Sequence, residues 1–260
     1  MQNEKEKIII QAIEYMKHHL DEDITSESLA QYVGYSPFHF SRMFKDVTGV
    51  SPRLYLSALR IEAGKQILID SSDSILKTLL NVGFRSVGTF SSKFKQFVGL
   101  PPKQFQRNIH SLHSYLNEYD FSKELEPLEV LAPSVTCHII KPQQFKGMIF
   151  VGLFPRAIPD QAPIVGTAIH HKKTSCTFSK VPLGTYYLLT AAIPRSINPR
   201  TYFVLDEAYR GRVEQPILIE KNTMIDVEVT LREPLPYDPP ILINLPKLLF
   251  ERENRKQEEK

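Results

Sequence analysis

The chain has 260 residues, of which 42% are apolar and 23% are charged. This balance excludes a disordered chain and allows one large or two ordinary globular domains. The formal net charge of +3 by itself favours neither nucleic acid nor an acidic substrate, but the charge is uneven: residues 33–108 carry eleven basic and four acidic side chains, whereas residues 111–260 carry 18 of each sign. The basic excess therefore belongs to one segment.

Neither export nor a membrane span is expected. The start, MQNEKEKIII, lacks the apolar stretch of a secretory signal. The longest apolar run, Met148 to Phe154, has seven residues, far fewer than the ~20 that cross a bilayer. The two cysteines, Cys137 and Cys176, form no CxxC motif, so we expect buried thiols and no metal site. The expectation is a cytoplasmic protein without a cofactor.

Up to about residue 117 the apolar side chains recur at helical spacing. A first helix is expected over about residues 3–20, with an apolar stripe of Ile9, Ile13, Met16 and Leu20. Hydroxyl side chains predict where later helices begin: at Ser26, and at Ser36-Pro37 and Ser51-Pro52, where a capping residue precedes a proline. The helix from Pro52 should run to about Ile69 without a break.

An internal repeat carries the functional signal. Residues 33–55, VGYSPFHFSRMFKDVTGVSPRLY, align with residues 82–105, VGFRSVGTFSSKFKQFVGLPPKQF, with one extra residue in the second copy. Each copy predicts a helix, a tight turn at Gly34 or Gly83, and a second helix, which is the order of a helix-turn-helix. The second helix of each copy is the candidate reader of DNA.

Helical geometry sorts each reading helix into two faces. In the first, the side chains expected to pack inward are Phe40, Met43, Phe44 and Val47. Those expected to point outward are Phe38, Ser41, Arg42 and Lys45. An outward arginine suits a major groove, because it bonds guanine O6 and N7 bidentately, and a flat ring suits a thymine methyl. A core role for Phe38 is equally open, and Arg42 with Lys45 could also form a solvated face.

The second reading helix is poorer in base readers. Its outward side chains are Gly88, Ser91, Ser92 and Lys95. The helix that joins the two copies has about eighteen residues, or ~27 Å at ~1.5 Å per residue, and with a turn at either end it could hold the readers ~34 Å apart. Both would then enter successive major grooves on one side of the DNA, and bent or easily bent DNA would be favoured.

The segment VGYSPFHFSRMFKDVTGVSPRLYLSALRIEAGKQIL, followed by ILKTLLNVGFRSVGTFSSKFKQFVGLPPKQFQR, resembles the AraC/XylS family of bacterial transcription regulators. The resemblance covers roughly residues 5–110 and implies two helix-turn-helix units joined by a long helix. The base-contacting positions that it implies are Phe38, Ser41 and Arg42 in the first unit and Val87, Gly88, Ser91 and Ser92 in the second. Ser92 stands where many members of the family have arginine, so it is open whether the second unit reads bases directly. If it does not, Arg85 and Lys95 would chiefly hold phosphates.

After residue 128 the pattern changes to short alternating or β-branched runs between proline-rich turns. Eight such runs are expected as strands: 135–141, 147–154, 162–169, 174–178, 184–193, 200–209, 215–220 and 224–231. Their spacing predicts a sandwich. The stretch TFSKVPLGTYYLLTAAI is similar to transthyretin-type or carboxypeptidase-regulatory-type β-sandwiches, which implies a binding, dimerising or bracing module and no particular reaction.

Little chemistry is apparent in this β half, which has no GxGxxG, GxxxxGK[ST], GxSxG or HExxH motif. Asp206 and Glu207 with Arg210 could serve acid/base chemistry, but adjacent acids on a strand face opposite sides, so a surface salt bridge is the favoured interpretation. Four tyrosines could line a pocket, although alternating aromatic residues in a sandwich usually lie half in the core: Tyr186, Tyr187, Tyr202 and Tyr209.

The sequence thus predicts a multidomain α + β chain. Its expected parts are an all-α double helix-turn-helix domain (1–115), a linker (116–133), an all-β sandwich (134–250) and a charged tail (251–260). We expect a sequence-specific transcription regulator and not an enzyme, with no catalytic residues. Its expected partner is double-stranded DNA; a small-molecule effector, RNA polymerase and a second copy of the chain are further candidates. The alternatives are an enzyme or carbohydrate-binding module in the β half, delivered by the helical half, and a purely architectural sandwich.

Overall fold

The computed structural model describes residues 2–71, 74–119 and 130–258. Most of the predicted linker and the end of the charged tail lie outside these residues. The chain divides into two compact units: Met1–Asn108 with Leu235–Leu242, called the helical unit below, and Ile109–Pro234 with Ile243–Lys260, called the β unit. Helices thus fill the N-terminal part and sheets the C-terminal part, as expected. None of the described helices has the length and apolarity needed to cross a membrane.

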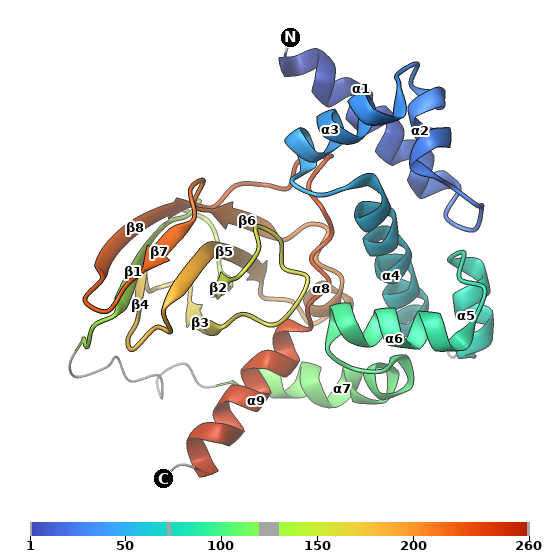
Figure 1. The fold of residues 1–260 in the computed structure, drawn as a ribbon. Helices are drawn as coiled ribbons and strands as arrows, with labels where there is room; N and C mark the ends of the chain where they lie inside the picture. Colours follow the sequence, from blue (N-terminus) through green and yellow to red (C-terminus); the bar gives the residue numbers. More distant parts are fainter. Residues whose placement is uncertain (1, 72–73, 120–129, 259–260) are drawn as a thin grey trace. The chain divides into compact units, whose positions relative to one another are not determined.

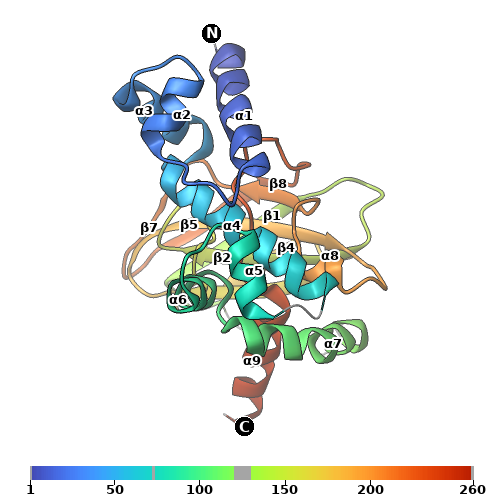
Figure 2. The same cartoon turned by 90° about the vertical axis from the view of Figure 1, so that its right-hand side faces the viewer.

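The helical unit contains two similar groups of helices at the two ends of one long helix. Its elements are α1 (Gln2–His18), α2 (Ser26–Tyr32), α3 (Pro37–Thr48), α4 (Pro52–Asp70), α5 (Ile75–Asn81), α6 (Val87–Val98) and the first part of α7 (Pro102–Glu118). Figures 1 and 2 show α1, α2 and α3 at the beginning of α4, and α5 and α6 at its end. The predicted order of two helix-turn-helix units joined by a long helix is therefore present.

Turns and caps follow the predicted chemistry with one correction. Gly34 and Gly83 have φ of 77° and 76°, in the left-handed region that suits glycine. The second helix is capped by Thr25 and not by Ser26: the Thr25 hydroxyl accepts a hydrogen bond from the Ser28 backbone N–H, and the Ser28 hydroxyl bonds the Thr25 backbone in return. Ser28 thus completes a capping box, and the cap lies one residue earlier than predicted, while α2 begins at Ser26.

The repeat is also a repeat of packing. In the first group the Phe44 ring meets the Tyr55 ring edge-on at 5.4 Å, and in the second the Phe94 ring meets the Phe105 ring at the same distance. Both phenylalanines are fully buried. Aromatic pairs in this geometry add to the free energy gained by burying the rings themselves. Each reading helix is thereby fixed to the helix that follows it.

A distant segment completes the helical unit. Leu235–Leu242, called the returning segment below, comes from the C-terminal part of the chain but belongs to this unit. The Tyr55 hydroxyl donates to the Asp238 backbone carbonyl at 2.9 Å, and the fully buried Lys65 donates to the Leu242 carbonyl at 3.3 Å. Both donors lie on α4. The returning segment therefore lies along α4 and accepts hydrogen bonds from polar groups that the helix buries.

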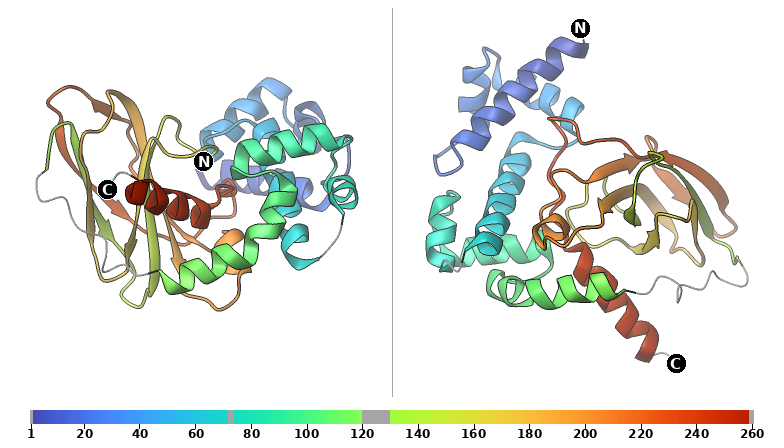
Figure 3. Two further views of the ribbon diagram at one scale, coloured as in Figure 1. Left: turned by 90° about the horizontal axis from the view of Figure 1, so that it is seen from below. Right: turned by 180° about the vertical axis from the view of Figure 1, so that it is seen from behind.

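The β unit contains two sheets. Its strands are β1 (Ser134–Ile140), β2 (Gly147–Phe154), β3 (Val165–His170), β4 (Ser175–Phe178), β5 (Gly184–Pro194), β6 (Tyr209–Arg212), β7 (Ile217–Ile219) and β8 (Met224–Thr230). One sheet has the order β4-β1-β8; the other has the order β3-β2-β5-β6, with β7 also paired to β5. Figure 3 shows both from two sides. Buried side chains of both sheets, among them Val135, Ile149 and Leu188, belong to one core cluster.

Two short helical elements accompany these sheets: α8 (Arg200–Phe203) and α9 (Leu245–Glu258). The expected strand over 200–209 is therefore wrong, because its first four residues form α8 and β6 begins only at Tyr209. Local hydrogen bonds explain the difference. The Asn198 side chain accepts from the Arg200 backbone N–H, and the Tyr202 hydroxyl accepts from the Ser196 backbone N–H. These bonds close a turn where β-branched and aromatic composition favours a strand.

Candidate nucleic-acid interface

The first reading helix is α3, and its faces are those predicted. Phe40, Met43 and Phe44 are buried, whereas Val47 is only half-buried. On the opposite face Arg42 and Lys45 are exposed, and Ser41 is half-buried. No ion pair to Arg42 is found among the described residues. The guanidinium is therefore presented to solvent and to any partner that approaches α3.

The exposure of the Phe38 side chain excludes a core role, which was one of its two predicted roles. Its side chain is 81% exposed at the start of α3, so the ring does not fill the core. Nearby, the rings of Tyr35 and His39 are stacked at 5.3 Å, and both residues are exposed. An apolar ring left in water at this position costs free energy unless a partner covers it. Phe38 thus lies with Arg42 on the outward face.

The second reading helix, α6, presents an equivalent face with different chemistry. Val87, Gly88, Ser92 and Lys95 are exposed and Ser91 is half-buried. A side chain added at Gly88 would meet no heavy atom within 4 Å, so this part of the helix is fully open. Lys95 is the only permanent cation in this set. The face can offer an apolar surface, two hydroxyls and one charge.

The two reading helices differ at their N-termini. Ser86 accepts a hydrogen bond from the Thr89 backbone N–H and so caps α6, whereas Ser36 has the extended backbone of a cap but no side-chain bond to α3. The first-turn N–H groups of a helix have no partner inside the helix and are favourable donors to phosphate. The sequence predicted a cap at Ser36 but did not identify Ser86, and the geometry shows that the Ser36 hydroxyl is not bonded to α3.

A set of contacts around Arg60, called the brace below, joins the first group of helices to the second helix-turn-helix. Arg60 of α4 donates from Nε to the Leu20 carbonyl at 2.9 Å and from Nη2 to the Glu22 carbonyl at 2.6 Å. Partial burial lowers the pKa of Arg60, although the guanidinium remains charged. Gly83 lies against the same Leu20 carbonyl and the Arg60 side chain. Sequence reasoning missed this arrangement, because it joins residues that are 23 to 63 positions apart.

Arg85 belongs to the same region. Its guanidinium is 3.1 Å from the Asp23 carboxylate, and both side chains are about four-fifths exposed. Exposed pairs of this kind contribute little to stability, so the pair can open when a phosphate competes for the arginine. Arg85 therefore remains a candidate phosphate contact that has a carboxylate partner in the free protein.

The described part of the β unit shows no cluster of metal-ligating side chains. Nowhere among the described residues do three His, Cys, Asp or Glu side chains meet as a metal site would require. Cys137 and Cys176 face each other across β1 and β4 as free cysteines, the first buried and the second half-buried. Asp206 and Glu207 lie in an exposed bend and not on a strand, so the argument from opposite strand faces does not apply to them.

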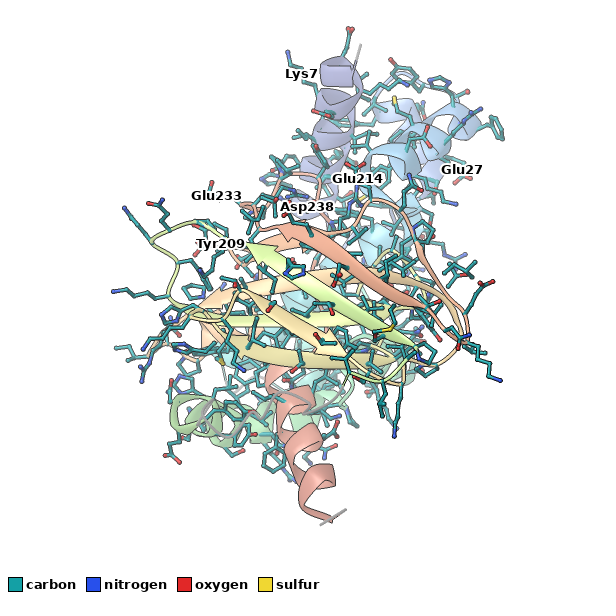
Figure 4. All side chains as sticks on the ribbon, turned by 90° about the vertical axis from the view of Figure 1, so that its left-hand side faces the viewer. Lys7, Glu27, Tyr209, Glu214, Glu233 and Asp238 are labelled. Carbon is teal, nitrogen blue, oxygen red and sulfur yellow. The ribbon has the colours of Figure 1, made fainter. Side chains whose placement is uncertain are left out.

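The burial of the four tyrosines fits the interpretation that they lie at least partly in the core. Tyr186 and Tyr202 are buried, and Tyr187 and Tyr209 are half-buried. Tyr209, labelled in Figure 4, begins β6, and its ring meets the Phe145 ring at 5.7 Å. Strand pairing places Tyr186, Tyr187 and Tyr209 in or beside the core, and Tyr202 is buried on α8. The structure therefore concentrates candidate binding chemistry on α3 and α6.

A comparison with known protein families matches the part of the chain that contains α3 and α6. Residues 29–108 match a family model described as a helix-turn-helix domain. The uncharacterised HTH-type transcriptional regulator YobQ of Bacillus subtilis is 31% identical over 100 residues, which are 38% of this chain and 42% of YobQ. The chain thus covers less than half of the length of this relative.

Solved structures match a similar share of the chain. The C-terminal domain of AraT, a response regulator from Geobacillus stearothermophilus, is 31% identical over 39% of this chain and 84% of that domain, with a TM-score of 0.38. A transcriptional regulator from Chromobacterium violaceum, described as having an AraC-type DNA-binding domain, is 28% identical over 39% of this chain and 91% of its own, with a TM-score of 0.38.

Proposed function

Because this chain belongs to the AraC family through its helix-turn-helix domain, we propose that it binds specific DNA sequences with two reading helices. In this proposal α3 and α6 enter successive major grooves. Phe38, Ser41 and Arg42 contact bases, with Lys45 beside them. The corresponding positions of α6 are Val87, Gly88, Ser91 and Ser92, while Arg85 and Lys95 hold phosphates.

The observation that carries the proposal is the outward face of α3. This face combines an exposed arginine that has no ion-pair partner among the described residues with an aromatic ring that is 81% exposed. Arginine reads guanine, and an apolar ring covers a thymine methyl. The helix begins with N–H groups that no serine hydroxyl caps, and such groups favour a phosphate at the edge of the groove. Base and backbone contacts are thus available from one helix.

For the β unit we propose a sensor or dimerisation role and no catalysis. Its two sheets share one core cluster, which supports the expected sandwich, and sandwiches commonly present binding or dimer surfaces. The candidate ligands remain a small-molecule effector and a second copy of the chain. RNA polymerase is a further proposed partner of the whole regulator.

Selection from random DNA tests the proposed function. The full chain is incubated with a pool of random duplexes, and the bound fraction is sequenced after several rounds. We expect one enriched submotif from α3, joined by a second about 10 bp away if α6 also reads bases. A single submotif would assign readout to α3 alone and leave α6 with phosphate contacts. A bound pool without sequence enrichment would contradict specific recognition.

A further inference from the structure

The balanced charge of the C-terminal part conceals a strong segregation. Residues 130–205 contain one acidic side chain, Asp160, and eight basic ones, whereas residues 206–234 contain seven acidic and four basic ones. Asp160 is ion-paired with Arg156 at 2.9 Å. The basic residues of the first stretch are Lys141, Lys146, Arg156, Lys172, Lys173, Lys180, Arg195 and Arg200. A local excess of +7 therefore lies in the β unit, as large as the excess over residues 33–108.

The fold gathers five of these cations at one end of the larger sheet. Strand pairing sets Gly147 opposite Pro194 and Met148 opposite His170, so the start of β2 adjoins the ends of β5 and β3. The Arg195 N–H donates to the Lys146 carbonyl at 3.1 Å. The Ile139 N–H donates to the Thr174 carbonyl at 2.7 Å and brings the end of β1 to the same place. We call Lys141, Lys146, Lys172, Lys173 and Arg195 the basic rim.

Three of the five rim cations form no ion pair among the described residues. They are Lys146, Lys172 and Arg195, and all three are exposed. Asp206 and Glu207 come just before β6, the strand beside β5. In the described part of the chain they form no ion pair with the rim. Burial lowers the pKa of His170, and the positive charges of Lys172 and Arg195 lower it further. The charges of Lys172 and Arg195 therefore lie close enough to act on His170.

Two properties of the rim indicate the chemistry of its partner. The cations sit on long side chains spread over several loops, which suits a row of negative charges better than one small anion. The phenylalanine of these loops, Phe145, is buried, and the rings of His170 and His171 are half-buried and lie 3.9 Å apart. Among the described residues the rim therefore presents no fully exposed ring for stacking on the bases of a single strand. Double-stranded DNA offers regularly spaced phosphates and needs no stacking surface.

We propose that the basic rim binds the phosphate backbone of double-stranded DNA and gives the β unit a sequence-independent share of the affinity. The proposal rests on the proposed function, which brings a long duplex to this chain. It assigns the β unit a contact with DNA in addition to any effector or dimerisation role. The rim reads no bases, because lysine and arginine contacts to phosphate carry no sequence information by themselves.

The test measures the salt dependence of binding by three variants of the full chain and the wild type. The rim variant carries Lys146→Gln, Lys172→Gln and Arg195→Gln. The control variant carries Lys180→Gln, Arg212→Gln and Lys221→Gln, which remove the same charge from exposed residues of the β unit. A charge-preserving variant with Lys146→Arg, Lys172→Arg and Arg195→Lys separates charge from shape. Circular dichroism confirms that all four proteins fold.

Affinity is measured from about 50 to 200 mM salt on a ~60 bp duplex that holds the selected site, and on a scrambled duplex of equal length. Each lost phosphate contact flattens the slope of log affinity against log salt by about 0.9, so the rim variant should lose up to ~2.7. Over this four-fold range the affinity of the wild type should then fall about 40-fold more than that of the rim variant. The control and charge-preserving variants should keep the wild-type slope.

The two duplexes separate failure of the inference from failure of the proposed function. The salt slope of the rim variant should be flattened equally on the two duplexes, because phosphate contacts do not depend on sequence. Equal slopes for the rim variant and the wild type would overturn the inference, and this is also the result expected if the rim serves an acidic protein. An equal loss in the control variant would overturn it too. Wild-type binding that does not distinguish the duplexes would instead reject the proposed function, with the slopes still measurable.

Discussion

At the scale of single residues, base recognition by α3 should depend most on Arg42. Its side chain is exposed, so the substitution Arg42→Ala removes a potential base contact without opening the core. We expect the selected site to lose about 1–3 kcal/mol of discrimination at one base pair, because a bidentate arginine–guanine contact is worth about that much. Competition binding against all single-base variants of the site measures the change. An unaltered preference at every position would rule out base readout by Arg42.

The substitution Lys95→Ala tests a phosphate contact, for comparison with the base contact of Arg42. Lys95 is exposed on α6, and we assign it to phosphate. Its loss should weaken binding to all sequences alike and flatten the salt slope by about 0.9, while the pattern of base preference stays as in the wild type. If Lys95→Ala instead changed the preference at one base pair, α6 would read bases through this residue.

The serines before the two reading helices should differ in their effect on stability. The Ser86 hydroxyl accepts from the Thr89 N–H at 3.1 Å, whereas the Ser36 hydroxyl makes no such bond to α3. Loss of a capping hydroxyl typically costs about 1 kcal/mol. We therefore expect Ser86→Ala to lower the free energy of unfolding by about that amount and Ser36→Ala to leave it nearly unchanged. Chemical denaturation measures both, and equal losses would contradict the difference in capping.

At the scale of elements, the two turns of the repeat offer a matched pair of glycines. Gly34 and Gly83 have nearly the same positive φ, so alanine at either position pays a similar backbone cost of about 1–2 kcal/mol. Their surroundings differ. An added Cβ at Gly34 meets nothing within 4 Å, whereas at Gly83 it would overlap the Leu20 carbonyl oxygen beside Arg60.

We expect Gly34→Ala to lower the free energy of unfolding by about 1 kcal/mol and Gly83→Ala by about 3 kcal/mol or more, since overpacking adds to the strain. Thermal and denaturant unfolding of both variants measure the difference. Gly83→Ala should also weaken binding to the selected site, because displacement of Leu20 disturbs the brace that positions the second helix-turn-helix. Similar losses in the two variants would show that the close contact at Gly83 does not stabilise the fold.

Local signals explain which elements could be predicted from the sequence. Ser36-Pro37 and Ser51-Pro52 placed two helix starts correctly, because the capping residue and the proline act on their own neighbours. The start of the second helix at Ser26 was predicted, but its cap was missed by one residue, since capping by Thr25 depends on a reciprocal bond with Ser28. The strand expected over 200–209 failed for a related reason. Hydrogen bonds from Ser196 and Arg200 close a turn there, and strand propensity does not reveal them.

The candidate site was predictable to the extent that it depends on helical periodicity. Helical periodicity predicted that Arg42 points outward and that Phe40 packs inward, and the structure agrees. It could not decide the position of Phe38, because the first turn of a helix lies at the edge of the core. The brace through Arg60 and the Arg85–Asp23 pair were also out of reach. Both join residues that are distant in sequence, and no local pattern records such contacts.

At the scale of the whole molecule, the division into units does not follow chain order. The sequence predicts a helical N-terminal domain and a β domain after it, yet the returning segment belongs to the helical unit. Tyr55 and Lys65 of α4 donate to its carbonyl groups. Lys65 is fully buried on this central helix, and a buried ammonium needs an acceptor, but its burial is a structural fact that the sequence does not show. The acceptors come from a segment that follows the last strand.

This arrangement predicts that substitutions near the C-terminus act on the helical unit. Leu242 and Leu249 are 2% and 3% exposed, but the first belongs to the helical unit and the second, on α9, to the β unit. Each leucine-to-alanine change should cost about 2–5 kcal/mol. We expect Leu242→Ala to speed amide hydrogen exchange in α4, and Leu249→Ala to speed it in α9 and in the end of α7, where Tyr115 contacts Phe250. Exchange reports the local free energy of opening, so mass spectrometry of both variants separates the units. Unchanged exchange of α4 in Leu242→Ala would show that the returning segment does not support this helix.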